Sequence, residues 1–271
     1  MNFKLDPMLP NLEERYNAAI QSFWQMRRNE PIVDDEDESE AEDITVRSGK
    51  HLDSLRDLVR DIVVHAGLLD SHIKTAERLQ LPGYFRPEKQ WDLLVIADDS
   101  LVAAIECKSQ LATKISKNYN NRVEEAIGTA NDLWTAYRGG RLGIFRPLLG
   151  YLFVLEDTEK TRRSLTPLKE PYFEADQIFK VPSSDDGTME LLALDVKPPK
   201  KTLRSVSYAM RYEVLLERLV LEKLYDTTCL TLATNETPSK IHTSSVHSFR
   251  KFAADLAGQV IKFLGNRQGA K

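Results

Sequence analysis

Cysteine and long apolar runs are scarce in this chain of 271 residues. The two cysteines, Cys107 and Cys229, have no metal-binding spacing and are too few for a disulfide framework. We therefore expect no zinc site, and we expect the protein to be located in the reducing cytoplasm. No apolar run approaches the length that crosses a bilayer, and the first residues have no signal-peptide core, so a soluble protein without membrane contact is expected.

Motifs of several enzyme classes are also missing. The chain has no Gly-rich phosphate loop, no nucleophile elbow and no internal repeat. The length and composition, 42% hydrophobic and 29% charged, allow one large domain with a substantial core or two small domains, and we favour one. We therefore expect residues 1–271 to form a single domain.

The formal charge of −4 hides an uneven distribution. Eight of the ten residues 34–43 are acidic, and the rest of the chain carries 37 basic and 33 acidic side chains. Such a run is typical of a solvated linker, and we expect an acidic flexible linker at 31–46. The alternative is a mobile DNA mimic that covers a basic cleft until substrate binds.

A predicted β-hairpin carries the residues most suited to chemistry. The turn-forming residues 98–100 are flanked by two strand-like runs, 91–97 and 101–108. If the turn has three residues, Asp92 lies opposite Glu106 on the neighbouring strand. A two-residue turn would instead put Asp92 opposite Ile105, so the pairing depends on the register.

Alternation along the strands then places Asp92, Glu106 and Lys108 on one face and Cys107 on the other. Two adjacent carboxylates repel each other unless a cation lies between them, and a hard divalent ion such as Mg²⁺ suits their oxygens. The pattern predicts a metal-dependent nuclease site. Asp92, Glu106 and the main-chain carbonyl of Cys107 are the expected metal ligands, and Lys108 is the expected catalytic ammonium group beside them.

A second acid-x-Lys triplet, Asp195-Val196-Lys197, also ends a strand-like run, 190–196. The same register would set Gln177 opposite Asp195, and two prolines end the strand directly afterwards. Because the upstream acid is missing, we do not expect this triplet to be catalytic.

Helical spacing of apolar residues predicts several helices around the hairpin. They are expected at 11–26, 52–66, 70–79, 122–137, 207–225 and 249–264. Strands are expected at 148–155, buried on both faces and parallel to the 101–108 strand, and at 227–234. The helix 207–225 is apolar around much of its surface, which fits either a dimer interface or, our preference, a core helix.

Polar residues between the hairpin and the next helix are candidates for DNA contact. A loop beside the metal site suits phosphate and base-edge contacts, although a polar loop with helix-capping asparagines has the same composition. The candidates are Lys114, Lys117, Asn118, Asn120, Asn121 and Arg122.

Several segments resemble the XhoI family of type II restriction endonucleases, within the PD-(D/E)XK nuclease superfamily. They are residues 83–87, 90–94, 105–110, 120–130, 132–138, 150–157 and 211–225. Trp91 departs from the broader superfamily pattern, which has proline at that position.

The resemblance implies an α/β fold with a central mixed β-sheet flanked by helices, and with additional helices at both ends. It also implies a Mg²⁺-dependent homodimer that cuts both strands of double-stranded DNA at the palindrome CTCGAG and leaves 5′ extensions. A cognate DNA methyltransferase would protect the host DNA. The alternatives are a structure-directed repair nuclease of the same superfamily and a DNA-binding module without catalysis.

Overall fold

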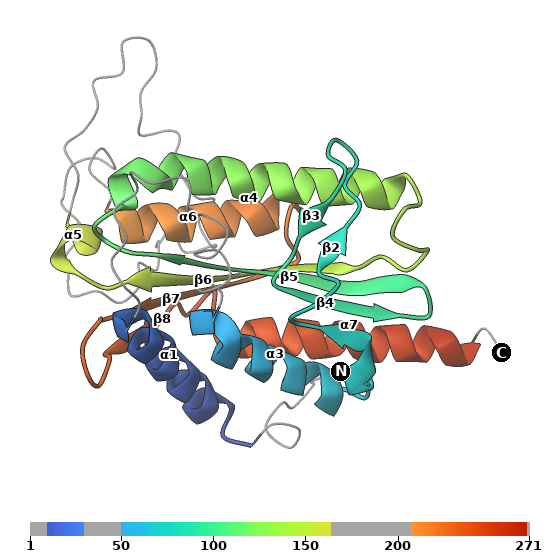
Figure 1. Cartoon of the computed structure of the whole chain (residues 1–271), viewed down its shortest axis with the longest axis horizontal. Coiled ribbons are helices and arrows are strands. Elements are labelled where there is room, and N and C mark those ends of the chain that lie inside the picture. Colours follow the sequence, from blue (N-terminus) through green and yellow to red (C-terminus); the bar gives the residue numbers. More distant parts are fainter. Residues whose placement is uncertain (1–9, 30–49, 164–206, 270–271) are drawn as a thin grey trace, which may run out of the picture.

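The computed structural model describes residues 10–29, 50–163 and 207–269. The acidic run 34–43 and the second acid-x-Lys triplet at 195–197 lie outside these residues. A mixed sheet of six strands forms the middle layer, and helices cover both of its faces (Figure 1). This α/β arrangement confirms the fold class predicted from the sequence and is compatible with a restriction-endonuclease-like core.

The strands follow the order β1-β4-β5-β6-β7-β8 across the sheet. The β5–β6 and β6–β7 pairs are parallel, and the other three pairs are antiparallel. The strands are β1 Ile73–Lys74, β4 Leu93–Ala97, β5 Ser100–Gln110, β6 Leu148–Glu156, β7 Thr227–Ala233 and β8 Ile241–Thr243. A separate small sheet consists of β2 Gln80–Leu81 and β3 Lys89–Gln90.

Two helical layers bury opposite faces of the sheet (Figure 1). One layer contains α4 Ile115–Arg138 and α6 Tyr208–Leu221, and the other contains α1 Leu12–Asn29, α3 Asp53–His65 and α7 Phe249–Gly269. Shorter elements are α5 Glu159–Arg162 and the 3₁₀ turns η2 Lys50–Leu52 and η3 Asp70–His72. Alternation along the strands divides their side chains between the layers: Leu94 packs with α4 and α6, whereas Leu93 and Cys107 pack in the other core.

The central strand β6 behaves as its sequence predicts. Eight of its nine residues are buried, and it runs parallel to β5 with Glu106 beside Tyr151. The long helix α4 makes the connection between these two strands. Parallel neighbours need such a crossover, and the helix needs a sheet face on which to bury its apolar stripe.

Two of the predicted helices differ from those in the structure. The segment 70–79 forms only a 3₁₀ turn followed by strand β1, because Ile73 pairs with Val95 at the edge of the sheet. Helix α4 begins at Ile115 and not near Arg122. The side chain of Ile115 is fully buried, and this packing extends the helix over residues whose composition suggested a loop. Among the described residues, no helix is both long and apolar enough to cross a membrane.

Candidate active site

The hairpin that carries the candidate site has an irregular register. Its turn contains two residues, Asp98 and Asp99, both with positive φ (48° and 54°), so the predicted three-residue turn was wrong. Two such residues give a turn whose twist matches the strands. The register then shifts by one residue between Val95 and Ile96, and beyond this bulge Leu93 pairs with Ile105.

The bulge sets the position of the first candidate acid. Because Leu93 pairs with Ile105, Asp92 lies one step further along, at the position opposite Glu106. Strand β4 begins only at Leu93, and the side chain of Asp92 continues the pairing: its Oδ2 accepts a hydrogen bond of 2.8 Å from the main-chain N–H of Cys107. Its Oδ1 lies 3.1 Å from Nη2 of Arg56, which reaches it from α3. The Asp92 carboxylate is therefore held against β5 and has a cation beside it.

The second candidate acid, Glu106, is more deeply buried than Asp92. Glu106 is 2% exposed, and two ammonium groups contact its carboxylate. Lys108 Nζ lies 2.6 Å from Oε1, and Lys89 Nζ lies 2.9 Å from Oε2. Lys89 comes from β3 and also lies over the ring of Trp91, 4.8 Å from its centroid. A buried carboxylate needs such compensation, because its charge would otherwise be strongly penalised.

Helix α4 contributes a third acid, Glu125. Its carboxylate lies 3.0 Å from Nζ of Lys108 and 2.6 Å from Nη1 of Arg122. Burial tends to lower the pKa of Lys108, but the charges of Glu106, Glu125 and Asp92 outweigh burial and raise it. Burial acts to raise the pKa of Glu125, but the charges of Lys108 and Arg122 outweigh burial and lower this pKa. Cations and carboxylates thus alternate from Lys89 to Arg122.

Comparison with known proteins identifies the family. A family model described as restriction endonuclease XhoI matches residues 34–190. The type II restriction enzyme XhoI of Xanthomonas vasicola is 36% identical over 207 residues, which cover 75% of this chain and 73% of that protein. The chain belongs to the XhoI family of type II restriction endonucleases.

Two further relatives have the same kind of activity in their names. The type II restriction enzyme BstVI of Geobacillus stearothermophilus is 34% identical over 69% of this chain and 75% of its own length. The type II restriction enzyme AbrI of Azospirillum brasilense is 44% identical over 57% of this chain and 71% of its own length. No solved structure matches the chain. The XhoI family match extends over the whole hairpin, β3 and α4.

The donor atoms of the hairpin fit Mg²⁺. The Cys107 thiol is buried in the opposite core, and burial, with the nearby charge of Asp92, raises its pKa well above the usual value, so only the main-chain carbonyl is available as a ligand. In a strand the N–H and C=O of one residue point the same way, so this carbonyl faces the side on which Asp92 lies.

Two carboxylates and a carbonyl are hard oxygen ligands. Mg²⁺ is commonly held by so few protein groups, because water and substrate phosphate complete its octahedron. Within the described ranges no cluster of three or more Asp, Glu, His or Cys residues could hold a metal by itself. The hairpin therefore offers oxygen donors of the kind that a hard divalent ion prefers, but too few to form a complete metal site by themselves.

The predicted DNA-contact residues are only partly brought to this centre. Arg122 joins it through Glu125. The predicted loop was wrong, because the other candidates lie around the first turns of α4, upstream of Glu125. Asn118 is half-buried, whereas the remaining candidates are exposed: Lys114, Lys117, Asn120 and Asn121.

Three charged residues of the network were missed by sequence reasoning: Arg56, Lys89 and Glu125. Glu125 could have been found, because it lies in the family-like segment 120–130 and one helical turn after Arg122. Lys89 lies one residue before the family-like segment 90–94, but its contact with Glu106 requires β3 to fold across the hairpin. Arg56 gave no signal in the sequence, because it is 36 positions from Asp92.

Proposed function

We propose that this restriction endonuclease cleaves DNA by Mg²⁺-dependent hydrolysis of one phosphodiester per subunit, with Asp92, Glu106 and Lys108 as the catalytic residues. The hydrogen bond from Cys107 to Asp92 supports this proposal most directly. It fixes the Asp92 carboxylate, which lies just before β4, at the position opposite Glu106. The ammonium group of Lys108 forms ion pairs with both Glu106 and Glu125.

Asp92, Glu106 and the Cys107 carbonyl would hold the metal on one side of β5. When bound, Mg²⁺ supplies Lewis acidity, which activates a water molecule and stabilises charge on the phosphate. Arg56 forms an ion pair with Asp92, and Lys89 forms one with Glu106. Part of this contact must loosen when another cation enters the site.

Lys108 would position the reacting groups as a charged donor. Its ion pairs with Glu106 and Glu125 keep the amine protonated, so Lys108 donates hydrogen bonds and does not act as a general base. An ammonium group directed at the phosphate stabilises the negative charge that grows during in-line attack. Glu125 belongs to α4 and not to the hairpin, and its carboxylate holds the Lys108 side chain in place. Glu125 therefore acts through Lys108, as a positioning residue.

The finer parts of the proposal concern the substrate and the assembly. On the resemblance described above, we propose cleavage of both strands at CTCGAG with 5′ extensions by a homodimer, since a two-fold protein matches a two-fold site. We place DNA contacts on the polar start of α4, at Lys114, Lys117, Asn118, Asn120, Asn121 and Arg122. Residues 1–271 act as a single nuclease domain, and a cognate methyltransferase protects host DNA.

The deciding experiment is a digest of unmethylated plasmid DNA that contains one CTCGAG site, with and without Mg²⁺, followed by sequencing of the ends. We expect a single linear product with 5′ extensions only when Mg²⁺ is present. A smear would indicate a structure-directed nuclease, and binding without cleavage would indicate a DNA-binding module. The Lys108→Ala protein should bind the site and fail to cut it, and retained cutting would remove Lys108 from the proposed roles.

A further inference from the structure

The loop 82–88 between β2 and β3 exposes two large aromatic side chains. Phe85 is 71% exposed and Tyr84 is 49% exposed. Their rings lie edge to face, with centroids 5.0 Å apart. Single exposed apolar residues are ordinary, but adjacent aromatic rings at the tip of a fixed loop form a surface suited to binding.

The loop is fixed by one carboxylate of α4. Asp132 Oδ1 accepts hydrogen bonds of 2.8 Å from the main-chain N–H groups of both Tyr84 and Phe85, and Oδ2 accepts one of 2.7 Å from Nε of Arg86. Burial acts to raise the pKa of Asp132, but these donors outweigh burial and lower it. A carboxylate that accepts three hydrogen bonds holds the tip of the loop in one conformation.

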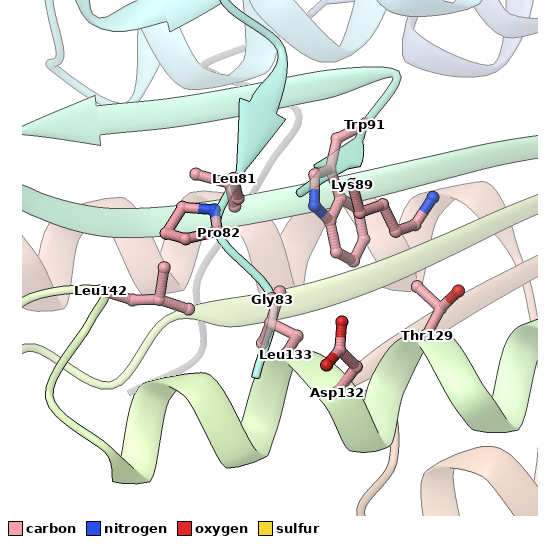
Figure 2. Close-up of a pocket in the computed structure, with 9 residues that line it drawn as sticks. All are labelled: Leu81, Pro82, Gly83, Lys89, Trp91, Thr129, Asp132, Leu133 and Leu142. Carbon is pink, nitrogen blue, oxygen red and sulfur yellow. The ribbon is translucent and has the colours of Figure 1, made fainter. Parts of the chain in front are cut away.

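Close packing at the base of the loop requires glycine. A Cβ atom at Gly83 would lie 2.4 Å from Asp132 Oδ2 and 2.8 Å from the Arg86 carbonyl, so a larger residue would separate the loop from α4. Figure 2 shows Gly83 against Asp132, with Trp91 and Lys89 on the other side of the cavity. The cavity beneath the loop measures only about 10 Å³, which is room for about one water molecule, so ligands are restricted to the outer side of the loop.

The outer side forms a groove that leads to the active site. The groove has a volume of about 420 Å³ and lies between Phe85 and α4, with Glu125, Gly128 and Asn131 among its lining residues. Glu125 is the partner of catalytic Lys108, and the loop continues directly into β3, where Lys89 contacts Glu106. The exposed ring and the catalytic groups are therefore connected on both sides, through α4 and through β3.

We propose that Phe85 stacks against a base of the substrate DNA next to the phosphate that is cut, and that the groove holds this nucleotide. The inference rests on the proposed function. Phenylalanine offers no hydrogen-bond group, so it would contribute stacking or a wedge between base steps, while the Asn131 amide suits a base edge.

The groove fits DNA better than a second copy of the chain, because Glu125 of the lysine network is among its lining residues and DNA must reach that network to be cut. The guanidinium of Arg141 lies 5.3 Å from the Tyr84 ring centroid and is exposed, so it is accessible to a phosphate of DNA bound at the loop. A fixed aromatic wedge also loses little conformational entropy on binding.

Binding of a labelled CTCGAG duplex, with Ca²⁺ in place of Mg²⁺ to prevent cutting, tests the inference. We expect Phe85→Ala and Phe85→Leu to weaken binding by about 5- to 150-fold, the range of one base–aromatic stack, because neither replacement has a ring. Phe85→Trp should bind as wild type does, and its emission should be quenched by the duplex. The native tryptophans give a constant background, because Trp24, Trp91 and Trp134 are 1%, 3% and 7% exposed.

The matched control is Leu69→Ala. Leu69 is 67% exposed, nearly as much as Phe85, but it follows α3 in the other helical layer, so its loss should leave binding unchanged. Equal binding and cutting by Phe85→Ala and wild type would overturn the inference, as would unchanged emission of the Phe85→Trp protein at saturation. A change of sedimentation in Phe85→Ala, with DNA binding intact, would assign the surface to a second copy and overturn it too. If wild type neither binds nor cuts any DNA, the proposed function itself fails.

Discussion

The main-chain N–H of Cys107 donates a 2.8 Å hydrogen bond to the carboxylate of Asp92. Strand β4 begins one residue later, so this side chain takes the place of a missing main-chain partner. The same carboxylate also carries the charge that a metal ligand needs, and Arg56 lies 3.1 Å from its other oxygen. The hydrogen bond gives Asp92 a structural role, and the proposed metal ligation would give it a chemical one; substitution can separate the two.

Asp92→Asn should keep the structural role and lose the chemical one. The amide oxygen can still accept from Cys107, so the free energy of unfolding should change by no more than about 1 kcal/mol. Without the negative charge, the initial rate of plasmid cleavage should fall by about 100-fold or more. Asp92→Ala removes both roles and should also destabilise the fold by about 1–3 kcal/mol in urea unfolding. Cutting by Asp92→Asn at the wild-type rate would show that Asp92 does not bind the metal.

Glu125 should affect turnover more than binding. Its carboxylate holds Lys108 at 3.0 Å, and Glu125→Gln removes that charge while keeping a similar shape. We expect kcat to fall by roughly 10- to 100-fold with a KM within about twofold, as for an outer partner of a catalytic group.

The matched control for this prediction is Glu222→Gln at the end of α6. Glu222 is 64% exposed and makes only a 3.7 Å ion pair with Arg218, so its loss should leave both kinetic constants unchanged. A rise in KM with unchanged kcat for Glu125→Gln would place Glu125 in DNA binding and not in the positioning of Lys108.

The period of apolar residues along the sequence predicted the helices and strands that bury one or both faces. The buried run of β6, its parallel pairing with β5 and the apolar stripe of α3 all appear as expected, because burial on a sheet face or helix face repeats with a fixed period. In the hairpin, the predicted turn was wrong, although Asp92 and Glu106 face each other as predicted. The turn is shorter than predicted, but the bulge after Val95 adds one residue back, so the facing positions of Asp92 and Glu106 follow from two compensating irregularities.

The rest of the site could not be predicted because it depends on contacts between distant segments. Arg56 reaches Asp92 from α3, and Lys89 reaches Glu106 because the small β2–β3 sheet is fixed to α4 by Asp132. The early start of α4 has the same kind of cause, since Ile115 is buried by tertiary packing and not by its neighbours in sequence. Periodicity carries no information about such contacts.

Buried His247 should make the stability depend on pH. Burial, and then the charge of Lys251, lower its pKa from 6.5 to about 4, and its Nδ1 lies 2.7 Å from the Thr228 hydroxyl. The unfolded chain takes up the proton near pH 6.5 and the folded protein only near pH 4, so the free energy of unfolding falls as the pH falls between these values. The total loss from this group is about 3 kcal/mol.

Urea unfolding at pH 7 and pH 4.5 measures this loss. The His247→Gln protein should lose less stability over that interval than wild type, because glutamine takes up no proton. His65→Gln is the control, since His65 is exposed and lies outside the buried contact with Thr228. Identical pH dependence of wild type and His247→Gln would show that His247 is not the residue responsible.

One substitution, glycine to alanine, should have opposite effects at two sites. A Cβ at Gly150 in β6 would lie 2.6 Å from Ile105 Cδ1 and 3.0 Å from Phe252 Cε2, and both neighbours are fully buried. Gly150→Ala should therefore destabilise the fold by about 1–3 kcal/mol through overpacking. A Cβ at Gly258 in α7 meets nothing within 4 Å, so Gly258→Ala should stabilise the fold by about 0.5–1 kcal/mol through helix propensity. The added methyl group is the same at both sites, so opposite changes of stability in urea unfolding would isolate the contribution of packing. Changes of the same sign would contradict the tight contact of β5, β6 and α7 at Gly150.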